Sequence, residues 1–225
     1  MKEKLIKIIQ PLYIVCLIMG MTLLFLTDME NEALALIVIA AILLAIDFKS
    51  VQPKIQFSKV SFSQYMKAIN GDTDRESLSN LLLEYEDIKL PQRATSGSAG
   101  YDLFSPCSFR LEVGESIKFP TGIRVKIENT NKFLLIVPRS SLGFKYRMQL
   151  DNTCGVVDRD YYHSDNEGHM FIKLTNDGKE GKVIEVNKGD AIAQGIFVDY
   201  GLTNDDDVKT VRNGGCGSTN KAVHK

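Results

Sequence analysis

Two long apolar runs near the start of the chain stand apart from everything that follows them. Leu12–Leu26 and Ala33–Ile46 contain no charged side chain, and the acidic turn Thr27–Glu32 separates them. At a rise of about 1.5 Å per residue, the first run, extended back to Leu5, spans the ~30 Å hydrocarbon core of a bilayer, whereas the second covers only about 21 Å. The pattern predicts two hydrophobic transmembrane α-helices, of which the second is marginal in length.

Lysines on the two outer sides of these runs predict their orientation. Three precede the first run and two follow the second: Lys2, Lys4, Lys7, Lys49 and Lys54. Because positive residues favour the cytoplasmic side of a membrane, both outer ends should face the cytoplasm. We expect residues 1–50 to form a membrane-anchoring helical hairpin that contacts membrane lipid through residues 5–48. A cleaved signal peptide and a buried helical pair are the two alternatives that stay open.

The next segment, residues 51–87, has a weaker pattern. Phe62–Ile69 has apolar residues at helical spacing, the sequence Asn70-Gly-Asp then interrupts it, and Ser77–Tyr85 is a second candidate helix. We predict a helical or irregular preamble over residues 51–87.

From Ile88 onward, short apolar runs rich in Val, Ile and Phe alternate with turn residues. Six such runs are Ser116–Phe119, Ile123–Ile127, Phe133–Val137, Phe171–Leu174, Lys182–Val186 and Ala191–Val198. Regular short strands with tight turns are typical of an all-β sandwich, jelly roll or barrel, and the lack of strand–helix alternation argues against a parallel α/β sheet. We predict an all-β domain over residues 88–209 and a flexible, Gly-rich C-terminal arm over residues 210–225.

Composition excludes several classes of function. The chain has 24% charged residues and a formal net charge of -1, and it shows no local basic patch, so we expect no nucleic-acid partner. Its four cysteines and three histidines have neither the spacing of a zinc site nor the density of a disulfide scaffold. These observations favour a reducing compartment and argue against a metal held by a cage of protein ligands.

Two polar segments are candidates for phosphate binding. Arg139 combines a guanidinium fork with the hydroxyls of Ser140 and Ser141 directly after a predicted strand, which makes a good phosphate clamp. A solvated turn is the plainer interpretation of the same residues. Near the C-terminus, glycines that permit close backbone approach accompany an arginine and two hydroxyls: Arg212, Gly217, Ser218 and Thr219.

Five separated segments resemble, in order, the five motifs of the trimeric dUTPase family. They are Ala99–Leu103, Pro138–Lys145, Asn152–Tyr161, Gly189–Gln194 and Arg212–Thr219. Each motif alone is weak, but their order makes the match specific. The resemblance implies a dUTPase-like β-barrel or jelly roll, a homotrimer with shared active sites, and hydrolysis of dUTP to dUMP and pyrophosphate by a dUTP diphosphatase.

The resemblance also implies which carboxylates serve the chemistry. Asp158 matches the catalytic base, which orients a water for attack on the α-phosphate. Asp160, two residues later, is a rival, and an ordinary turn aspartate is the plain alternative. Asp102 matches the carboxylate that holds a metal through water, with Mg2+ bound mainly by the substrate phosphates.

The remaining matches imply how the nucleotide is bound. Tyr161 matches the tyrosine that packs beneath the deoxyribose and excludes a 2'-hydroxyl, although it could equally be a core aromatic. Asn152 and Gly155 belong to the motif whose hairpin reads uracil, and Gln194 matches a glutamine near the phosphates. The resemblance further implies that the C-terminal arm, with Arg212, Gly217, Ser218 and Thr219, closes over the triphosphate.

Two departures from the family pattern qualify the function. The segment Tyr162–His169 is longer than the usual turn, and we expect it to lengthen a hairpin without touching catalysis. Cys216 stands where the last motif usually has a phenylalanine, and the lost base stack would cost on the order of 1–3 kcal/mol of binding. Two alternatives therefore stay open: a non-catalytic, membrane-bound nucleotide sensor or interaction module, and a dCTP deaminase-like enzyme of the same fold.

Overall fold

The chain divides into two compact units, Met1–Pro53 and Lys54–Lys225. The computed structural model describes residues 14–19, 21–22, 34–43, 54–69, 75–178, 180–210 and 214, with the side chains of residues 75–77 left out. Each unit is described separately below.

The first unit contains two short helical stretches, over residues 14–22 (residue 20 not described) and 34–43. Their large apolar side chains are mostly exposed, with Ile18 at 58% and Leu34 at 60% of full accessibility. Within the described part of the chain, no helix has the length and apolar character needed to cross a bilayer. The predicted transmembrane helices therefore find no support in the described residues, and the other residues of the predicted 5–48 lipid contact lie outside them.

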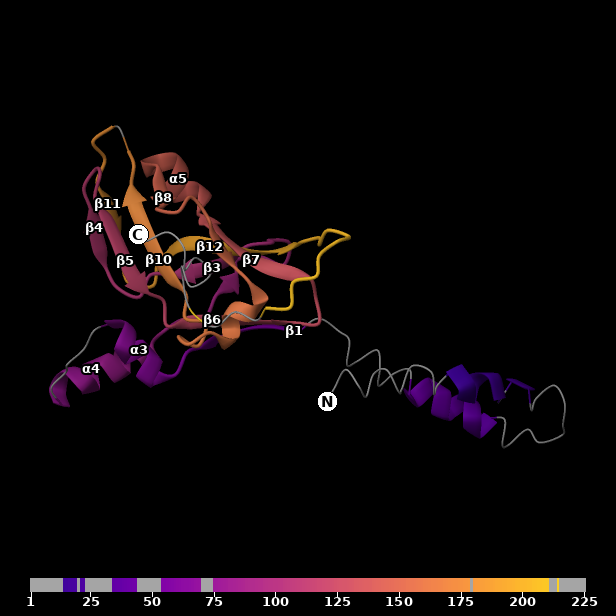
Figure 1. Ribbon diagram of the computed structural model, residues 1–225. Helices are drawn as coiled ribbons and strands as arrows, with labels where there is room; N and C mark the ends of the chain where they lie inside the picture. The colour runs from indigo at the N-terminus through magenta and orange to yellow at the C-terminus, as the bar shows by residue number, and fades with distance from the viewer. Residues whose placement is uncertain are drawn as a thin grey trace. The chain divides into compact units, whose positions relative to one another are not determined.

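The second unit is mostly β, as predicted, and its strands form four antiparallel groups (Figure 1). The largest sheet has the order β2-β3-β12-β7-β9, with bounds Gln92–Arg93, Tyr101–Phe104, Ala191–Asp199, Lys132–Pro138 and Gly155–Val157. A second sheet has the order β5-β10-β8, with bounds Ser116–Pro120, Phe171–Asn176 and Met148–Leu150. Two pairs complete the set: β1 (Lys54–Lys59) with β6 (Ile123–Glu128), and β4 (Phe109–Leu111) with β11 (Ile184–Val186).

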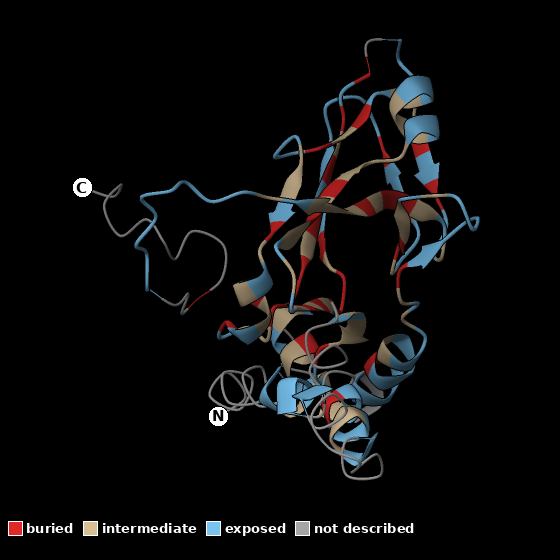
Figure 2. Cartoon of the chain, turned by 90° about the vertical axis from the view of Figure 1, so that its right-hand side faces the viewer, coloured by how far each residue is buried: buried red, intermediate tan, exposed pale blue. Residues whose placement is uncertain are grey.

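Alternation of apolar and polar residues explains why these segments form strands around one core. Successive side chains of a strand point to opposite faces, so apolar residues two apart share the inner face. In β6, Ile123, Val125 and Ile127 are buried, and the charged residues between them are half-buried. Figure 2 shows buried residues following the strands through the interior of this unit. All six predicted strands are present, with small differences at their ends.

The preamble is part of the second unit and begins with a strand that the sequence pattern did not predict. Both predicted helices are present, α3 as Phe62–Ile69 and α4 as Arg75–Glu86. Ahead of them, β1 pairs with β6 along its whole length, from Lys54 opposite Glu128 to Lys59 opposite Ile123. Ile55 and Phe57 alternate with polar residues and pack against the main core. The prediction of a helical or irregular preamble was therefore wrong for this stretch.

Candidate active site

Three predicted site residues meet where β3, β12 and β7 lie side by side. Gln194 of β12 is paired with Asp102 of β3 on one side and with Val137 of β7 on the other. Arg139 follows β7 directly, and its Nε lies 3.3 Å from Oδ1 of Asp102. The Nε2 of Gln194 donates a hydrogen bond of 3.3 Å to the carbonyl of Pro138. The strand register thus brings together motifs that are far apart in sequence, and we call Asp102, Arg139 and Gln194 the Arg139 cluster.

A glycine makes room for this cluster. A Cβ on Gly100 would lie 2.5 Å from Oε1 of Gln194, which is closer than real Cβ contacts come. The missing side chain therefore lets Gln194 lie across β3 towards the end of β7. The requirement explains why a glycine precedes Tyr101 and Asp102 in the first motif.

The hydroxyls of Ser140 and Ser141 lie beside the cluster in the first turn of α5 (Ser140–Tyr146). Both residues are exposed, and Arg139 is half-buried. The helix ends at Arg147, whose φ of 53° is left-handed and whose N–H bonds back to the carbonyls of Gly143 and Leu142. An arginine with two accessible hydroxyls at this end of β7 has the donors that phosphate oxygens require.

Two other predicted residues, Asn152 and Tyr161, line a cavity of about 390 Å³. Its lining residues come from the strands β5 and β10, the 3-10 helix η1 (Arg159–His163) and the neighbouring turns: Lys118, Asp151, Asn152, Tyr161, Asn166, Phe171 and Lys173. We call this cavity the Tyr161 pocket. Lys173 Nζ lies 2.6 Å from Oδ2 of Asp151, and its hydrogen bond, followed by that from Thr175, lowers the pKa of the Asp151 carboxyl.

The turn that carries Asn152 is held in a strained conformation. Thr153 has a φ of 67°, which is rare for a β-branched residue, and its N–H donates to the carbonyl of Leu150 at 2.8 Å. Cys154 N–H then donates to the carbonyl of Asn152 at 2.7 Å. Gly155 begins β9, where a Cβ would come within 3.3 Å of the Ile136 side chain. Such strain persists only where the surrounding structure fixes it, and it is common at ligand sites.

Asp158 and Tyr161 are joined by a single turn. Asp158 is the N-cap of the 3-10 helix η1 (Arg159–His163), and its carbonyl accepts a hydrogen bond of 3.2 Å from Tyr161 N–H. Tyr161 is buried, whereas Asp158 and its rival Asp160 are half-buried. Both carboxylates lie on the same turn, so the choice of Asp158 still rests on the motif.

Within one chain, Asp158 and Arg139 lie at opposite ends of β7. In the antiparallel pairing of β7 with β9, Val157 is opposite Leu134 and Gly155 is opposite Ile136. Asp158 therefore lies beside the start of β7, whereas Arg139 follows its last residue. At roughly 3.3 Å per residue, the five steps from Leu134 to Arg139 correspond to about 16 Å. The predicted base and the predicted phosphate clamp are not brought together in a single copy.

Four predicted binding residues of the C-terminal arm, Arg212, Gly217, Ser218 and Thr219, lie outside the described residues, as does Cys216. The sequence analysis in turn missed residues of the Tyr161 pocket, above all Asn166. The available signal was Asn166-Glu-Gly168, a turn-like sequence directly after the third motif.

The described residues fit a metal that arrives with a ligand better than a protein-built metal cage. In the described part of the chain, no group of three or more His, Cys, Asp or Glu could hold an ion. Asp102 is a single carboxylate paired with Arg139, and its side chain is 16% exposed. One carboxylate together with phosphate oxygens is a usual environment for Mg2+.

Comparison with known proteins places these observations in a family. The family model described as dUTPase matches residues 86–220. The deoxyuridine 5'-triphosphate nucleotidohydrolase of Lactococcus lactis is 38% identical over 135 residues, covering 59% of this chain and 88% of that protein. The protein of the same name from Haemophilus influenzae is 40% identical over 114 residues, covering 50% and 71%. The crystal structure of dUTPase from Streptococcus mutans has a TM-score of 0.48 at 28% identity, covering 66% of this chain and 98% of that chain.

Proposed function

The chain belongs to the dUTPase family, and from that premise we propose that it hydrolyses dUTP to dUMP and pyrophosphate. The observation that carries the proposal is the strand register that assembles Asp102, Arg139 and Gln194 from three separate motifs. An arginine held beside a carboxylate that can bind a metal through water, and beside a glutamine amide, suits a metal-bound phosphate. The Tyr161 pocket, to which the third motif contributes Asn152 and Tyr161, supplies a separate site for the base and sugar.

In the proposed reaction, Asp158 orients a water and accepts its proton. The water oxygen bonds to the α-phosphorus, and the bond from that phosphorus to the oxygen bridging to the β-phosphate breaks. Pyrophosphate leaves, and dUMP keeps the α-phosphate. Arg139 pairs with phosphate oxygens, Ser140 and Ser141 donate hydrogen bonds to them, and Gln194 fixes the strand edge beside them.

We propose Mg2+ as the cofactor, with Asp102 as the carboxylate that holds it through water. The ion would neutralise charge on the triphosphate oxygens and would be bound mainly by them. From sequence alone, Arg212, Gly217, Ser218 and Thr219 are proposed to close over the same phosphates.

Selectivity for base and sugar is assigned to the third motif. The strained turn around Thr153 would present the main chain near Asn152 and Gly155 to uracil. Tyr161 would pack beneath the deoxyribose, where a ring fixed by its surroundings leaves no room for a 2'-hydroxyl.

We further propose a homotrimer in which each active site takes residues from different copies. Support comes from the separation of Asp158 and Arg139 by about 16 Å along β7, because both residues are proposed to act on the phosphates of one substrate. A neighbouring copy that places its Tyr161 pocket against the Arg139 cluster would bring them together.

The proposed activity is tested by pyrophosphate release from dUTP, dTTP, dCTP and UTP with the full chain and Mg2+. Release from dUTP alone is the expected result, and Asp158→Asn should abolish turnover while leaving dUTP binding largely intact. Pyrophosphate release that is absent from the wild-type protein, although dUTP binds, would exclude hydrolysis. Ammonia release from dCTP would instead indicate a deaminase.

Attachment to membrane lipid at the cytoplasmic face is retained as a proposal for residues 1–50. It is supported by the uncharged runs and by the exposed apolar side chains of residues 14–22 and 34–43. Co-flotation of the full chain with liposomes tests it, with the double variant Leu17→Lys, Ile39→Lys as the comparison. Equal recovery of wild type and variant in the lipid-free fraction would rule it out.

A further inference from the structure

The segment Ser164–His169, which sequence analysis expected only to lengthen a hairpin, folds back onto Tyr161. Asn166 Nδ2 donates a hydrogen bond of 2.8 Å to the Tyr161 hydroxyl, and that hydroxyl donates at 2.8 Å to the carbonyl of His169. Ser164 Oγ donates to the carbonyl of Tyr161 at 2.6 Å. The insert therefore supplies hydrogen-bond partners for both the hydroxyl and the backbone carbonyl of the tyrosine, and the expectation that it does not touch catalysis stays a prediction.

The insert is locked in this conformation by close backbone packing. Gly168 has a φ of 71°, and a Cβ there would lie 2.8 Å from Cα of Tyr162 and 2.9 Å from the carbonyl oxygen of Tyr161. Gly168 N–H also donates to Oδ1 of Asn166 at 3.2 Å. The loop therefore lies directly on the backbone of the tyrosine turn, with Asn166 aimed at the Tyr161 hydroxyl.

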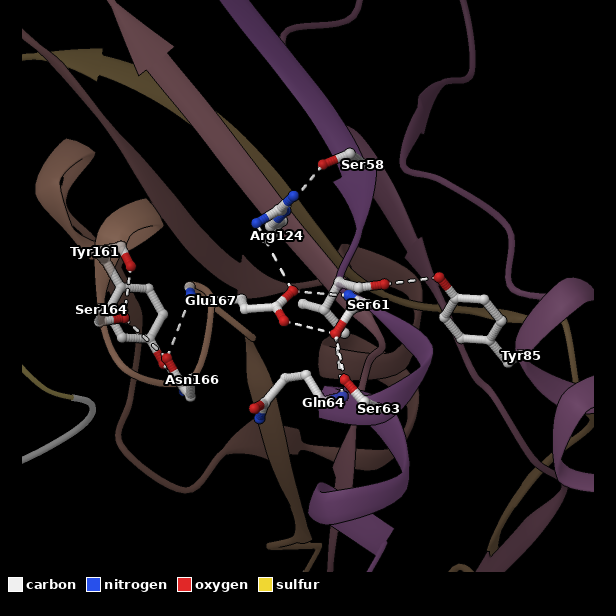
Figure 3. A network of polar contacts seen from close by, with 12 residues as sticks. Ser58, Ser61, Ser63, Gln64, Tyr85, Arg124, Tyr161, Ser164, Asn166 and Glu167 are labelled. Carbon is white, nitrogen blue, oxygen red and sulfur yellow. Dashed lines mark hydrogen bonds and ion pairs between the residues drawn. The ribbon is translucent and has the colours of Figure 1, made fainter. Parts of the chain in front are cut away.

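The outer side of the same loop is held by the N-terminal segment of the unit. Glu167, with a φ of 58°, points away from Tyr161 and accepts hydrogen bonds from Ser61 N–H at 2.7 Å and Ser61 Oγ at 2.5 Å (Figure 3). Arg124 Nη1 lies 3.8 Å from Oε2 of Glu167. Burial raises the pKa of Glu167, but the Ser61 hydrogen bonds and Arg124 outweigh it and lower the pKa overall, so the carboxylate stays ionised at neutral pH.

Ser61 directly precedes α3, in the stretch that comes before the match to the dUTPase family model at residue 86. A continuous set of contacts thus runs from this segment through Glu167 and Asn166 to Tyr161. Figure 3 shows the two halves of the network on the two sides of the loop.

We propose that Asn166 is a positioning residue for Tyr161, and that residues 54–86 hold the loop carrying it through the Ser61–Glu167 contact. This segment thereby sets the affinity and the deoxyribose selectivity of the Tyr161 pocket. The inference rests on the proposed function for the role of Tyr161, but its readout is nucleotide binding rather than turnover.

The test is the dissociation constant of dUMP and of UMP, measured by calorimetry with the full chain. In Asn166→Ala the Kd for dUMP should rise about tenfold and the preference for dUMP over UMP should narrow by a similar factor, as expected when the Tyr161 hydroxyl loses the hydrogen bond from Asn166. Glu167→Ala should shift both quantities in the same direction by about threefold, and Glu167→Gln, which keeps an acceptor for Ser61 N–H, should restore most of the loss. Combining Asn166→Ala with Glu167→Ala should add little to Asn166→Ala alone, because both act along one route.

Glu185→Ala is the matched control, since it removes an exposed carboxylate paired with Arg110 on the β4–β11 pair. An unchanged preference for dUMP over UMP in Asn166→Ala would overturn the proposal. Equal changes in the Kd for dUMP in Glu167→Ala and Glu185→Ala would overturn it as well. If Asn166→Ala does not fold, Asn166→Asp decides, because it keeps the acceptor for Gly168 and Ser164 and removes the amide donor that serves the Tyr161 hydroxyl and the carbonyl of His169. Pyrophosphate release measured in parallel separates the proposed hydrolysis from the proposed role of Asn166. If the wild type prefers dUMP over UMP but does not hydrolyse dUTP, only the proposed hydrolysis is excluded.

Discussion

The two ends of β7 carry the two halves of the candidate site and are built in different ways. At one end, the Arg139 cluster is positioned by main-chain register across three strands, and few side-chain hydrogen bonds restrain it. At the other end, Tyr161 is fixed by a turn, an inserted loop and hydrogen bonds to its hydroxyl. A charged phosphate is recognised by placing charges at the end of a strand, whereas rejecting one hydroxyl on a sugar needs a rigid shape.

The largest expected effect, on kcat/KM, tests whether each active site takes Arg139 from one copy and Asp158 from another. Arg139→Ala and Asp158→Asn should each lower kcat/KM by about 100-fold or more, since each removes a group that acts in the transition state. Mixing the two inactive proteins under conditions that allow subunit exchange should restore part of the activity, because mixed trimers contain some sites with both wild-type residues.

Pyrophosphate release by the mixture, compared with each variant alone, is the measurement. The control is the double variant, which carries both changes in one chain. It should stay inactive after the same subunit-exchange treatment. Lack of recovery in a mixture shown to exchange subunits would place each site within a single copy.

Adding a side chain at Gly168, which packs directly against the backbone of Tyr161 and Tyr162, should strongly destabilise the protein. Gly168→Ala forces a Cβ against backbone atoms and also carries the cost of a left-handed φ, together on the order of 3 kcal/mol. Gly114→Ala is the matched control, because its φ of 83° is also left-handed but no atom lies within 4 Å of the added Cβ. Urea unfolding should show a clearly smaller loss for Gly114→Ala, and equal losses would contradict the packing argument.

Acidic pH should lower the free energy of unfolding because of His169, which lies beside the loop that contacts Tyr161. This buried ring accepts a hydrogen bond of 2.8 Å from Gly122 N–H, and burial lowers its pKa from 6.5 to about 4, with Glu167 opposing the shift. Between these two values the unfolded chain binds a proton that the folded chain does not, so stability falls as pH drops from about 6.5 towards 4, by at most about 1.4 kcal/mol per pH unit.

Unfolding free energies at several pH values test this, with His169→Gln expected to flatten the slope. The exposed His163, changed to Gln in the same way, should keep the wild-type slope. A slope that is the same in both variants would show that His169 is not its source.

A change at the open end should affect activity and leave stability nearly intact. Gly100→Ala pushes only the far end of the Gln194 side chain, so it should lower kcat/KM for dUTP by about tenfold, equivalent to about 1.4 kcal/mol, with a small change in melting temperature. Gly97→Ala, where nothing lies within 4 Å, is the control. A wild-type kcat/KM in Gly100→Ala would show that the position of Gln194 does not matter for phosphate binding.

The smallest effect concerns the strained turn. Thr153→Asn should stabilise the chain by about 0.5–1 kcal/mol, because asparagine tolerates a left-handed φ better than a β-branched residue. The melting temperature should rise slightly while the affinity for dUMP stays within about twofold. A lower melting temperature would show that the threonine side chain contributes contacts that outweigh the strain.

Sequence patterns were informative wherever local periodicity decides the structure. Alternation in β6 predicted its strand and its buried face, and helical spacing predicted α3 with its observed bounds. The same approach missed β1, because its lysine-flanked alternation becomes recognisable as a strand only when β6 is available as a partner. For the long apolar runs, composition suggested transmembrane helices, and the described helices do not support that reading.

By itself, the sequence determined the β character of the main unit, the family motifs and the residue types available for chemistry, because these follow from local pattern and side-chain identity. Tertiary structure decided which of these residues meet: it joined Asp102, Gln194 and Arg139 through strand register, and it separated Asp158 from Arg139 along β7. It also turned an apparent hairpin insert into a support for Tyr161 held by Ser61. Contacts between residues so distant in the chain depend on register and backbone folding, which no local pattern encodes.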